Sequence, residues 1–394
     1  MKLLKYPHPY KAWFTLSNDP DHTTLDRWNK LHQAIWGKLE LPFSDSLFVK
    51  SYNDYVPGQV NLFDQKHLIL GHSYDTIHTW GDYVYSRDKV FTHNDAVEAV
   101  DIINEFGIKP LIWVDHSSFT GNFIKNSDWG TKAYHTDAAG HKYKNFVYSL
   151  DLAYSLGIRY IWDGYLVETI DQQPNIFRKK HIRGLVFDFF YKHLKGLFSR
   201  LFKVDIRRDE DSELNRYGLK IVDFGNGRRM YSFRRFGTWN DAHIDGIPKI
   251  VNESMLNKLV KNGGICFLYT HLGKKLAAAN HDEHISRETL DTFTLLKKYY
   301  EDKLINLSSF SKLLDYIVLK DSINIDMENS RIEFSPDGIR FKDLTCMDLA
   351  GQSFSFSISK SISIDGLLVY INGKKSVCHS IIVNTPKILT LSFQ

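Results

Sequence analysis

The sequence carries carboxylate and imidazole side chains in a pattern suited to binding a metal ion and activating water. Asp19 and Asp21 are separated by one residue and follow an apolar, β-prone run, and His72 and His78 lie six positions apart after a similar run. Imidazole and carboxylate ligands suit a zinc-type ion that keeps one position for water. We therefore expect Asp21, His72 and His78 to bind a divalent metal ion, most simply Zn²⁺, with Asp19 as the base that acts on water.

Each of these residues also has a purely structural interpretation. Asn, Asp and Pro are turn formers, and a single histidine at a strand end is commonly hydrogen-bonded within the fold. The functional interpretation is favoured because acidic or histidine residues recur at the ends of several predicted strands. The carboxyl ends of parallel strands lie on one rim, so these residues would lie close together. The rim candidates are Asp19, Asp21, His72, His78, Asp115, His116, His135, Asp163 and His271.

The elements that must position these side chains alternate between strand and helix. Strand-like runs cover 12–16, 47–49, 66–72, 110–114, 158–162, 265–269 and 304–307, and helix-like runs cover 25–39, 94–106, 150–155, 255–261, 287–300 and 310–317. This alternation predicts an α/β fold with a parallel sheet, either a barrel or a doubly wound layer. From 321 the runs shorten and alternate strictly, which predicts a small antiparallel β-domain over 321–394.

Composition excludes several classes of protein. The net charge of +4 over 394 residues is too small and dispersed for nucleic acid to be the main ligand. The three cysteines are widely spaced, which argues against a disulfide framework or a zinc knot. No apolar leader or spanning run is present, so we expect a cytoplasmic protein. Aromatic residues make up 14%, which suits a carbohydrate cleft but also a large core.

Three segments carry a family resemblance. Residues 16–21, Leu-Ser-Asn-Asp-Pro-Asp, resemble the first motif of the polysaccharide deacetylase (NodB-homology) superfamily. His72-Ser73 followed by His78 resembles the second motif, and 267–271, Phe-Leu-Tyr-Thr-His, resembles the last one. The motifs occur in the family's order, and the resemblance covers roughly residues 10–320.

The resemblance implies a fold, a reaction and residue roles. It implies an irregular (β/α) barrel over 1–320, often of seven strands, that removes an acetyl group from an N-acetylated sugar or glycan, as in surface-polysaccharide assembly. Asp19 would be the general base, Asp21, His72 and His78 would hold the metal, and His271 would protonate the leaving amine.

The chain departs from the family pattern in two places. The second-motif histidines are six residues apart instead of four, and the Arg-x-Pro-aromatic motif that braces the base is absent. Arg159, Arg234 and Arg235 are candidates to supply that arginine. Two other functions stay open: a non-catalytic glycan-binding protein on the same fold, and a glycoside hydrolase that uses two acids and no metal.

A basic-aromatic insertion interrupts the barrel at about 175–215. Over 176–203, Leu, Val and Phe alternate with Lys and Arg. This composition is too polar to span a bilayer but suits a helix lying on an anionic membrane surface. We expect either that location, at the inner membrane face near a lipid-linked glycan, or a helix packed on the barrel with its basic face in water.

Overall fold

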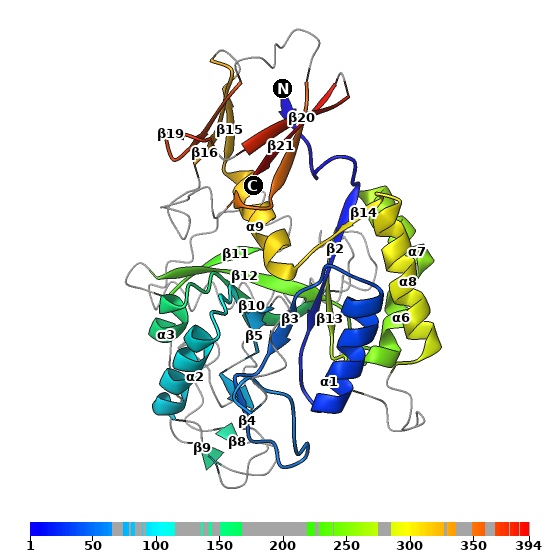
Figure 1. The fold of residues 1–394 in the computed structure, drawn as a ribbon, viewed down its shortest axis with the longest axis vertical. Coiled ribbons are helices and arrows are strands. Elements are labelled where there is room, and N and C mark those ends of the chain that lie inside the picture. Colours follow the sequence, from blue (N-terminus) through cyan, green and yellow to red (C-terminus); the bar gives the residue numbers. More distant parts are fainter. Residues whose placement is uncertain are drawn as a thin grey trace, which may run out of the picture.

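The computed structural model describes most of the chain. At a few of the described positions it describes the backbone but not the side chain. The described residues are 1–64, 74–78, 80–82, 89, 92–114, 135–136, 142–143, 150–167, 219–224, 228–238, 240–274, 285–326, 329–335, 349–358, 367–377, 379–385 and 387–393. They form a mixed α/β structure organised around a curled sheet (Figure 1).

Eight parallel strands make up the curled sheet, which is open like a half-barrel. Their order is β14 (Ile305–Leu307), β2 (Ala12–Asn18), β13 (Ile265–Thr270), β12 (Arg229–Phe236), β10 (Tyr160–Val167), β7 (Ile112–Val114), β5 (Tyr74–Ile77) and β3 (Asp45–Leu47). A ninth strand, β11 (Lys220–Asp223), pairs antiparallel with β12. The prediction of a parallel α/β sheet is confirmed, and β2, the strand before the two aspartates, is paired on both sides.

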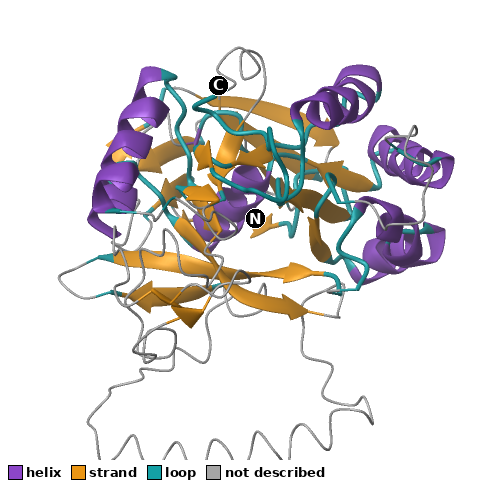
Figure 2. Cartoon of the chain, turned by 90° about the horizontal axis from the view of Figure 1, so that it is seen from below, coloured by secondary structure: helices purple, strands orange, loops and turns teal. Residues whose placement is uncertain are grey.

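Helices cover the outer face of the sheet (Figure 2). They are α1 (Leu25–His32), which continues as the π-helical turn η1 (Gln33–Lys38), α2 (His93–Glu105), α3 (Leu150–Ser155), the 3₁₀ turn η3 (Ile244–Gly246), α6 (Ile247–Ile250), α7 (Glu253–Asn262) and α8 (Arg287–Glu301). Local sequence sets several boundaries: Thr92 forms a capping box on α2, and α7 ends at Gly263, whose φ of 56° favours glycine.

Strand β2 shows how alternation separates the two faces of the sheet. Ala12, Phe14 and Leu16 belong to the core under the outer helices, whereas Trp13 belongs to the core on the concave side. Because side chains alternate along a strand, Thr15, Ser17 and the residue after the strand, Asp19, follow Trp13 onto the concave side. The strand therefore runs from an apolar start to a polar end.

Helix α9 (Phe310–Asp321) closes the concave side at the amino-terminal half of the strands. The Phe310 ring packs on Phe233 and Phe267, with ring centroids 4.9 and 5.2 Å away. The amide of Ser311 donates to Oδ2 of Asp75 at 2.7 Å, and burial raises the pKa of that carboxyl. Helix α9 thus fills the amino-terminal half of the concave side mainly with apolar side chains, and the concave-side residues Ser17, Asp19 and Arg235 lie toward the opposite rim.

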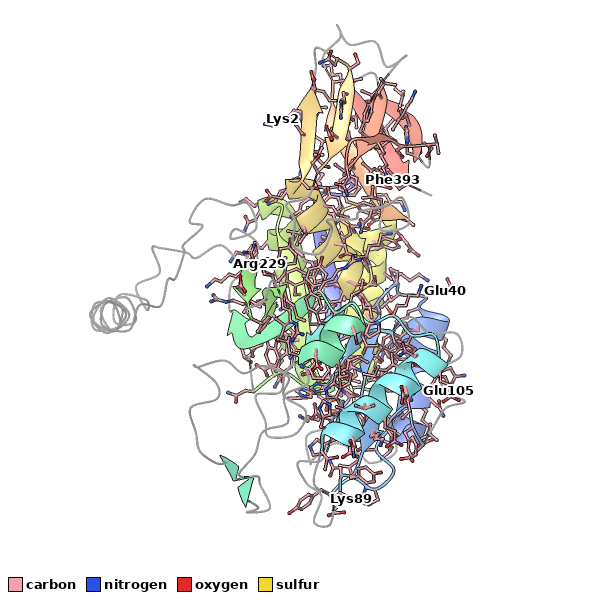
Figure 3. All side chains as sticks on the ribbon, turned by 90° about the vertical axis from the view of Figure 1, so that its left-hand side faces the viewer. Lys2, Glu40, Lys89, Glu105, Arg229 and Phe393 are labelled. Carbon is pink, nitrogen blue, oxygen red and sulfur yellow. The ribbon has the colours of Figure 1, made fainter. Side chains whose placement is uncertain are left out.

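The C-terminal strands form two four-stranded sheets beyond α9 (Figure 3, near Lys2 and Phe393). One contains β1 (Lys2–Leu3), β17 (Ser353–Ser357), β21 (Ile388–Phe393) and β20 (His379–Thr385), and the other contains β15 (Ile323–Asp326), β16 (Arg331–Phe334), β18 (Leu368–Ile371) and β19 (Lys374–Lys375). Two expectations need correction. β16 and β18 are parallel, since the long chain between them allows a crossover, and a strand from the N-terminus completes the first sheet.

Some strand predictions also need correction. The strand expected at 47–49 is β3 at Asp45–Leu47, and the one expected at 66–72 lies outside the described residues. β5 lies just after the strand expected at 66–72, in a stretch for which no strand was predicted. Its polar Asp75 is buried and accepts from the Ser311 amide of α9. β12 was not predicted, although it alternates over eight residues, because Arg235 occupies one of its inward positions.

Small two-stranded pairings complete the described structure, β4 (Lys50–Ser51) with β6 (Gly81–Asp82) and β8 (His135–Thr136) with β9 (Lys142–Tyr143). Among the described helices, none combines the length and apolar character needed to cross a membrane. The insertion at 176–203 lies outside the described residues, so its contact with a membrane surface stays a prediction.

We expect Phe310→Ala to lower the free energy of unfolding by about 3–5 kcal/mol, because it leaves a cavity between Phe233 and Phe267 that the sheet cannot fill. Chemical denaturation measures this. Val377→Ala, at a side chain that is 89% exposed, should change the value by less than about 0.5 kcal/mol. Equal losses in the two variants would contradict the role assigned to α9.

Candidate functional site

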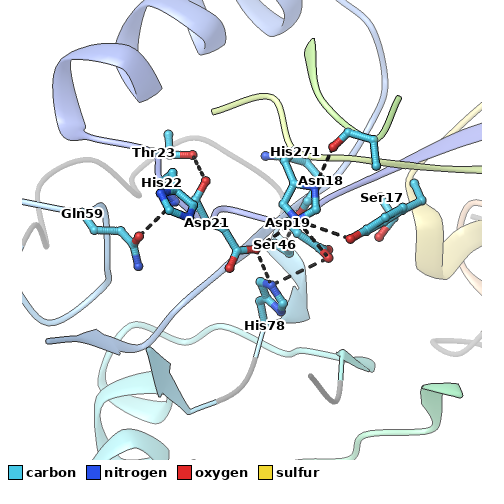
Figure 4. A network of polar contacts seen from close by, with 12 residues as sticks. Ser17, Asn18, Asp19, Asp21, His22, Thr23, Ser46, Gln59, His78 and His271 are labelled. Atoms are coloured by element: carbon cyan, nitrogen blue, oxygen red, sulfur yellow. Dashed lines mark hydrogen bonds and ion pairs between the residues drawn. The ribbon is translucent and has the colours of Figure 1, made fainter. Parts of the chain in front are cut away.

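Polar side chains at the ends of β2, β5, β12 and β13 meet at the carboxyl rim of the sheet. Figure 4 shows Asp19, Asp21, His78 and His271 among them. Asp19 directly follows β2, His78 directly follows β5, and His271 directly follows β13, while Arg235 is the penultimate residue of β12. Asp21 lies two residues beyond Asp19, before a left-handed residue, His22, whose amide donates to Oε1 of Gln59 at 3.0 Å.

One carboxylate oxygen of Asp21 is the meeting point of two imidazoles. Its Oδ2 lies 3.0 Å from Nε2 of His78 and 3.2 Å from Nε2 of His271. The His78 side chain is fully buried and stacks on the Phe48 ring at 4.9 Å, whereas 13% of the Asp21 side chain is exposed. The site is therefore rigid on the histidine side and reaches solvent at Asp21.

Asp19 is held by a buried arginine. Arg235 donates through Nη1 to Oδ1 of Asp19 at 2.6 Å and through Nη2 to Oδ2 at 3.0 Å, and Nη1 also reaches Oγ of Ser17 at 2.9 Å. The guanidinium carbon lies 3.6 Å from the ring centroid of Trp162 and 4.2 Å from that of Tyr269. This bidentate pair and the two ring faces fix the position of Asp19.

The surroundings of Asp19 keep it ionised. Burial by itself would raise its pKa, but the charges of Arg235, His78 and His271 outweigh burial and lower the pKa to about 2. Burial raises the pKa of Tyr269 well above its ordinary value, so this phenol keeps its proton. Asp19 is thus a permanent acceptor and Tyr269 a permanent donor at neutral pH.

Hydrogen bonding selects the tautomer of His271. Its Nδ1 lies 2.7 Å from the carbonyl oxygen of Ala242, which only accepts, so Nδ1 carries a proton. Nε2 faces the cluster, 3.3 Å from the Tyr269 hydroxyl and 4.0 Å from Oδ2 of Asp19. This nitrogen is therefore the ring position that faces both aspartates.

The cluster can bind a metal ion. Asp19, Asp21 and His78 each present one ligand atom, and these atoms lie within 4.8 Å of one another. Two oxygens and one imidazole nitrogen form a donor set that suits a zinc-type ion. Both Asp19 oxygens already receive Arg235, which makes Asp21 and His78 the better ligands of the three.

The structure brings together four of the five expected site residues: Asp19, Asp21, His78 and His271. The fifth, His72, lies outside the described residues, as do Asp115 and His116, and only the backbone is described for His135 and for Asp163, which lies within β10 instead of after it. Of the three arginine candidates, Arg235 contacts Asp19, whereas Arg159 lies 3.7 Å from Asp315.

Tyr269 and Trp162 were not anticipated as parts of the site. Tyr269 lies in β13 and His271, two positions later, directly follows this strand, so alternation places both on the concave side, a signal that was available in the sequence. Trp162 had no such signal, because its role depends on the guanidinium from another strand.

Compared with known proteins, the sequence matches no family model and no curated protein.

Removing the guanidinium should destabilise the protein strongly. We expect Arg235→Gln to cost about 3–5 kcal/mol in the free energy of unfolding, because Asp19 is left as an uncompensated buried charge. Arg234→Gln, one residue earlier on the other face of β12, should cost about 1 kcal/mol or less. Chemical denaturation of the two variants provides the test. An equal loss in the free energy of unfolding would contradict a stabilising role of the Asp19–Arg235 ion pair.

The lowered pKa of Asp19 also predicts a pH dependence. Its folded pKa of about 2 lies below the ordinary value, so ionised Asp19 stabilises the fold above about pH 4, and this contribution disappears as the pH falls toward 2. Denaturation of the metal-free protein should show the stability difference between wild type and Asp19→Asn shrinking by about 2 kcal/mol from pH 5 to pH 2. A difference that stays constant over this range would contradict the assignment.

Proposed function

We propose that this protein is a metal-dependent amide hydrolase that removes the acetyl group of an N-acetylated sugar or glycan. The observation that carries the proposal is the convergence of Asp19, Asp21, His78 and His271 on one rim, with Arg235 paired to Asp19. The resemblance of three segments to polysaccharide deacetylases supports the same reaction, because the residues that converge are those of the three motifs.

Asp21 and His78 are the proposed metal ligands, and His72 is the expected third. Their oxygen and nitrogen donors suit Zn²⁺. A bound divalent ion would supply Lewis-acid chemistry, making water more acidic and polarising the acetyl carbonyl. Asp21 is fixed for this purpose at 3.0 Å from Nε2 of His78, and its partial exposure opens the position to substrate.

Asp19 is the proposed proton acceptor. It is ionised at neutral pH, and Arg235 holds its two oxygens in place. Water that attacks the acetyl carbonyl carbon gives up a proton to Asp19.

His271 is the proposed proton donor to the leaving group. Its Nε2 is 4.0 Å from Asp19 Oδ2, and its Nδ1 is anchored on Ala242, so the ring is oriented while Nε2 exchanges the proton. The C–N bond breaks as Nε2 protonates the sugar nitrogen, and the products are acetate and a free amine. The Tyr269 hydroxyl, 3.3 Å from Nε2, supports this orientation.

The two alternative functions have less support. In a glycoside hydrolase one of two carboxyls acts as the acid, whereas Asp21, the carboxyl beside ionised Asp19, places Oδ2 3.0 and 3.2 Å from two imidazole nitrogens. A purely glycan-binding protein has no need for a buried ion pair oriented toward two histidines. A lipid-linked glycan substrate at the inner membrane face, within surface-polysaccharide assembly, is part of the proposal that rests on the family resemblance and the insertion.

The test combines metal content with acetate release. Purified protein should contain about one Zn²⁺ per chain and release acetate from N-acetylglucosamine oligomers, and a chelator should abolish this release until Zn²⁺ is restored. His78→Ala should lose the metal. Asp19→Asn should retain most of it but release acetate about 10²–10⁴-fold more slowly, because a proton acceptor is lost.

His379→Ala serves as the matched control, since this histidine lies in β20, away from the rim. It should change neither zinc content nor acetate release. Zinc-free protein that binds the same oligomers without releasing acetate would favour the glycan-binding alternative, and glycosidic cleavage that survives chelation would favour the glycoside hydrolase.

A further inference from the structure

We propose that Asn18, Asp45 and His32 are positioning residues that hold the end of β2, and with it Asp19 and Asp21, across the open edge of the sheet. The inference rests on the proposed function for the roles of the two aspartates. The three residues are buried. Asn18 lies in the first motif without a role assigned to it, and no motif included Asp45 or His32.

Asn18 connects three strands at the rim through its side chain and backbone. Its Nδ2 donates to Oδ1 of Asp45 on β3 at 2.8 Å, and its Oδ1 accepts from the amide of Leu272 at 2.9 Å. Its carbonyl oxygen accepts from the Ser46 hydroxyl. Because Asn18 directly precedes Asp19 and Leu272 directly follows His271, one side chain fixes the backbone beside both residues.

The contacts of Asn18 join β2 to β3, two strands that share no backbone ladder in the described sheet. In the described sheet, β3 pairs with β5 alone, and β2 pairs with β13 and β14. The sheet nevertheless curls until β3 lies beside the end of β2, where the contacts of Asn18 with Asp45 and Ser46 bridge the two strands. Side chains therefore define the distance between β2 and β3.

The end of β2 is held from both sides. Ser17 and Asp19 point to the concave side and both bind Arg235. Asn18 points the opposite way, toward Asp45. Loss of the outer contact leaves Asp19 attached to Arg235 but allows the backbone that leads to Asp21 to shift.

Asp45 links this contact to helix α1. Its Oδ1 also accepts from the Ser46 amide at 2.7 Å, and its Oδ2 lies 2.9 Å from Nε2 of His32. Since the carboxylate accepts on both oxygens, Nε2 of His32 is the donor. A buried carboxylate that loses this donor would turn or take up water, and its bond to Asn18 would weaken.

His32 is itself fixed by aromatic stacking. Its ring lies between Trp28 and Trp36, with centroids 4.2 and 4.3 Å away and interplanar angles of 27° and 19°. On an α-helix a step of four residues turns about 40° beyond one full turn. Three rings spaced four residues apart would therefore shift progressively around the helix and lose contact. The π-helical turn η1 holds more residues per turn, which brings Trp36 back onto His32.

The test compares three variants of α1. His32→Leu removes the donor, His32→Gln retains one, and Leu31→Ala destabilises the same helix without touching the chain of contacts. Titration with Co²⁺ alone, followed by absorption, should show about tenfold or more weaker binding in His32→Leu, as expected when residues that orient metal ligands are lost. Binding in His32→Gln and Leu31→Ala should stay within about threefold of wild type.

Amide exchange gives a second measurement that needs no metal. Protection of the Leu272 amide should fall in His32→Leu and persist in the other two variants, because this amide donates to Asn18. Unchanged Co²⁺ affinity and unchanged protection in His32→Leu would overturn the inference while leaving the proposed function intact. Wild-type protein that binds no Co²⁺ would instead remove the proposed function, and the exchange result would then decide the positioning role alone.

Discussion

The buried ion pair between Asp19 and Arg235 is the interaction on which the rest of the site depends. A carboxylate removed from water is unstable unless it is paired and hydrogen-bonded, and here two guanidinium nitrogens and two ring faces satisfy the pair. Because the pair is rigid, Asp19 is presented toward His78 and His271 at defined distances. A permanently ionised acceptor beside two imidazoles is the chemical core of the proposed reaction.

The remainder of the fold determines where this ion pair and the two histidines lie. Helix α9 fills the amino-terminal half of the concave side with Phe310, away from the rim where Asp19 and Arg235 pair. The alternation of β2 and β13 directs Asp19 and His271 to the same side. On the outer side, Asn18 holds β2 to β3 where no ladder joins them in the described sheet.

The sequence predicted the parallel α/β sheet and four converging residues because these depend on local patterns. Period-two alternation and polar residues after apolar runs are visible without knowing the fold, and they marked Asp19, Asp21 and His271 as candidates. His78 was a candidate because it accompanies His72, and the role of His271 came only from the resemblance to polysaccharide deacetylases. The choice among Arg159, Arg234 and Arg235 was not predictable, since it depends on which strand lies near β2. Strand β12 was missed because an inward arginine breaks the apolar pattern, and its stabilising partners come from β2, β10 and β13.

The most direct test of the account is anomalous diffraction at the zinc edge from crystals of the protein grown with Zn²⁺. We predict one strong peak within coordination distance of an Asp21 carboxylate oxygen and Nε2 of His78, with Asp19 still paired to Arg235. No peak at this rim, or a peak only at other residues, would contradict the central claim.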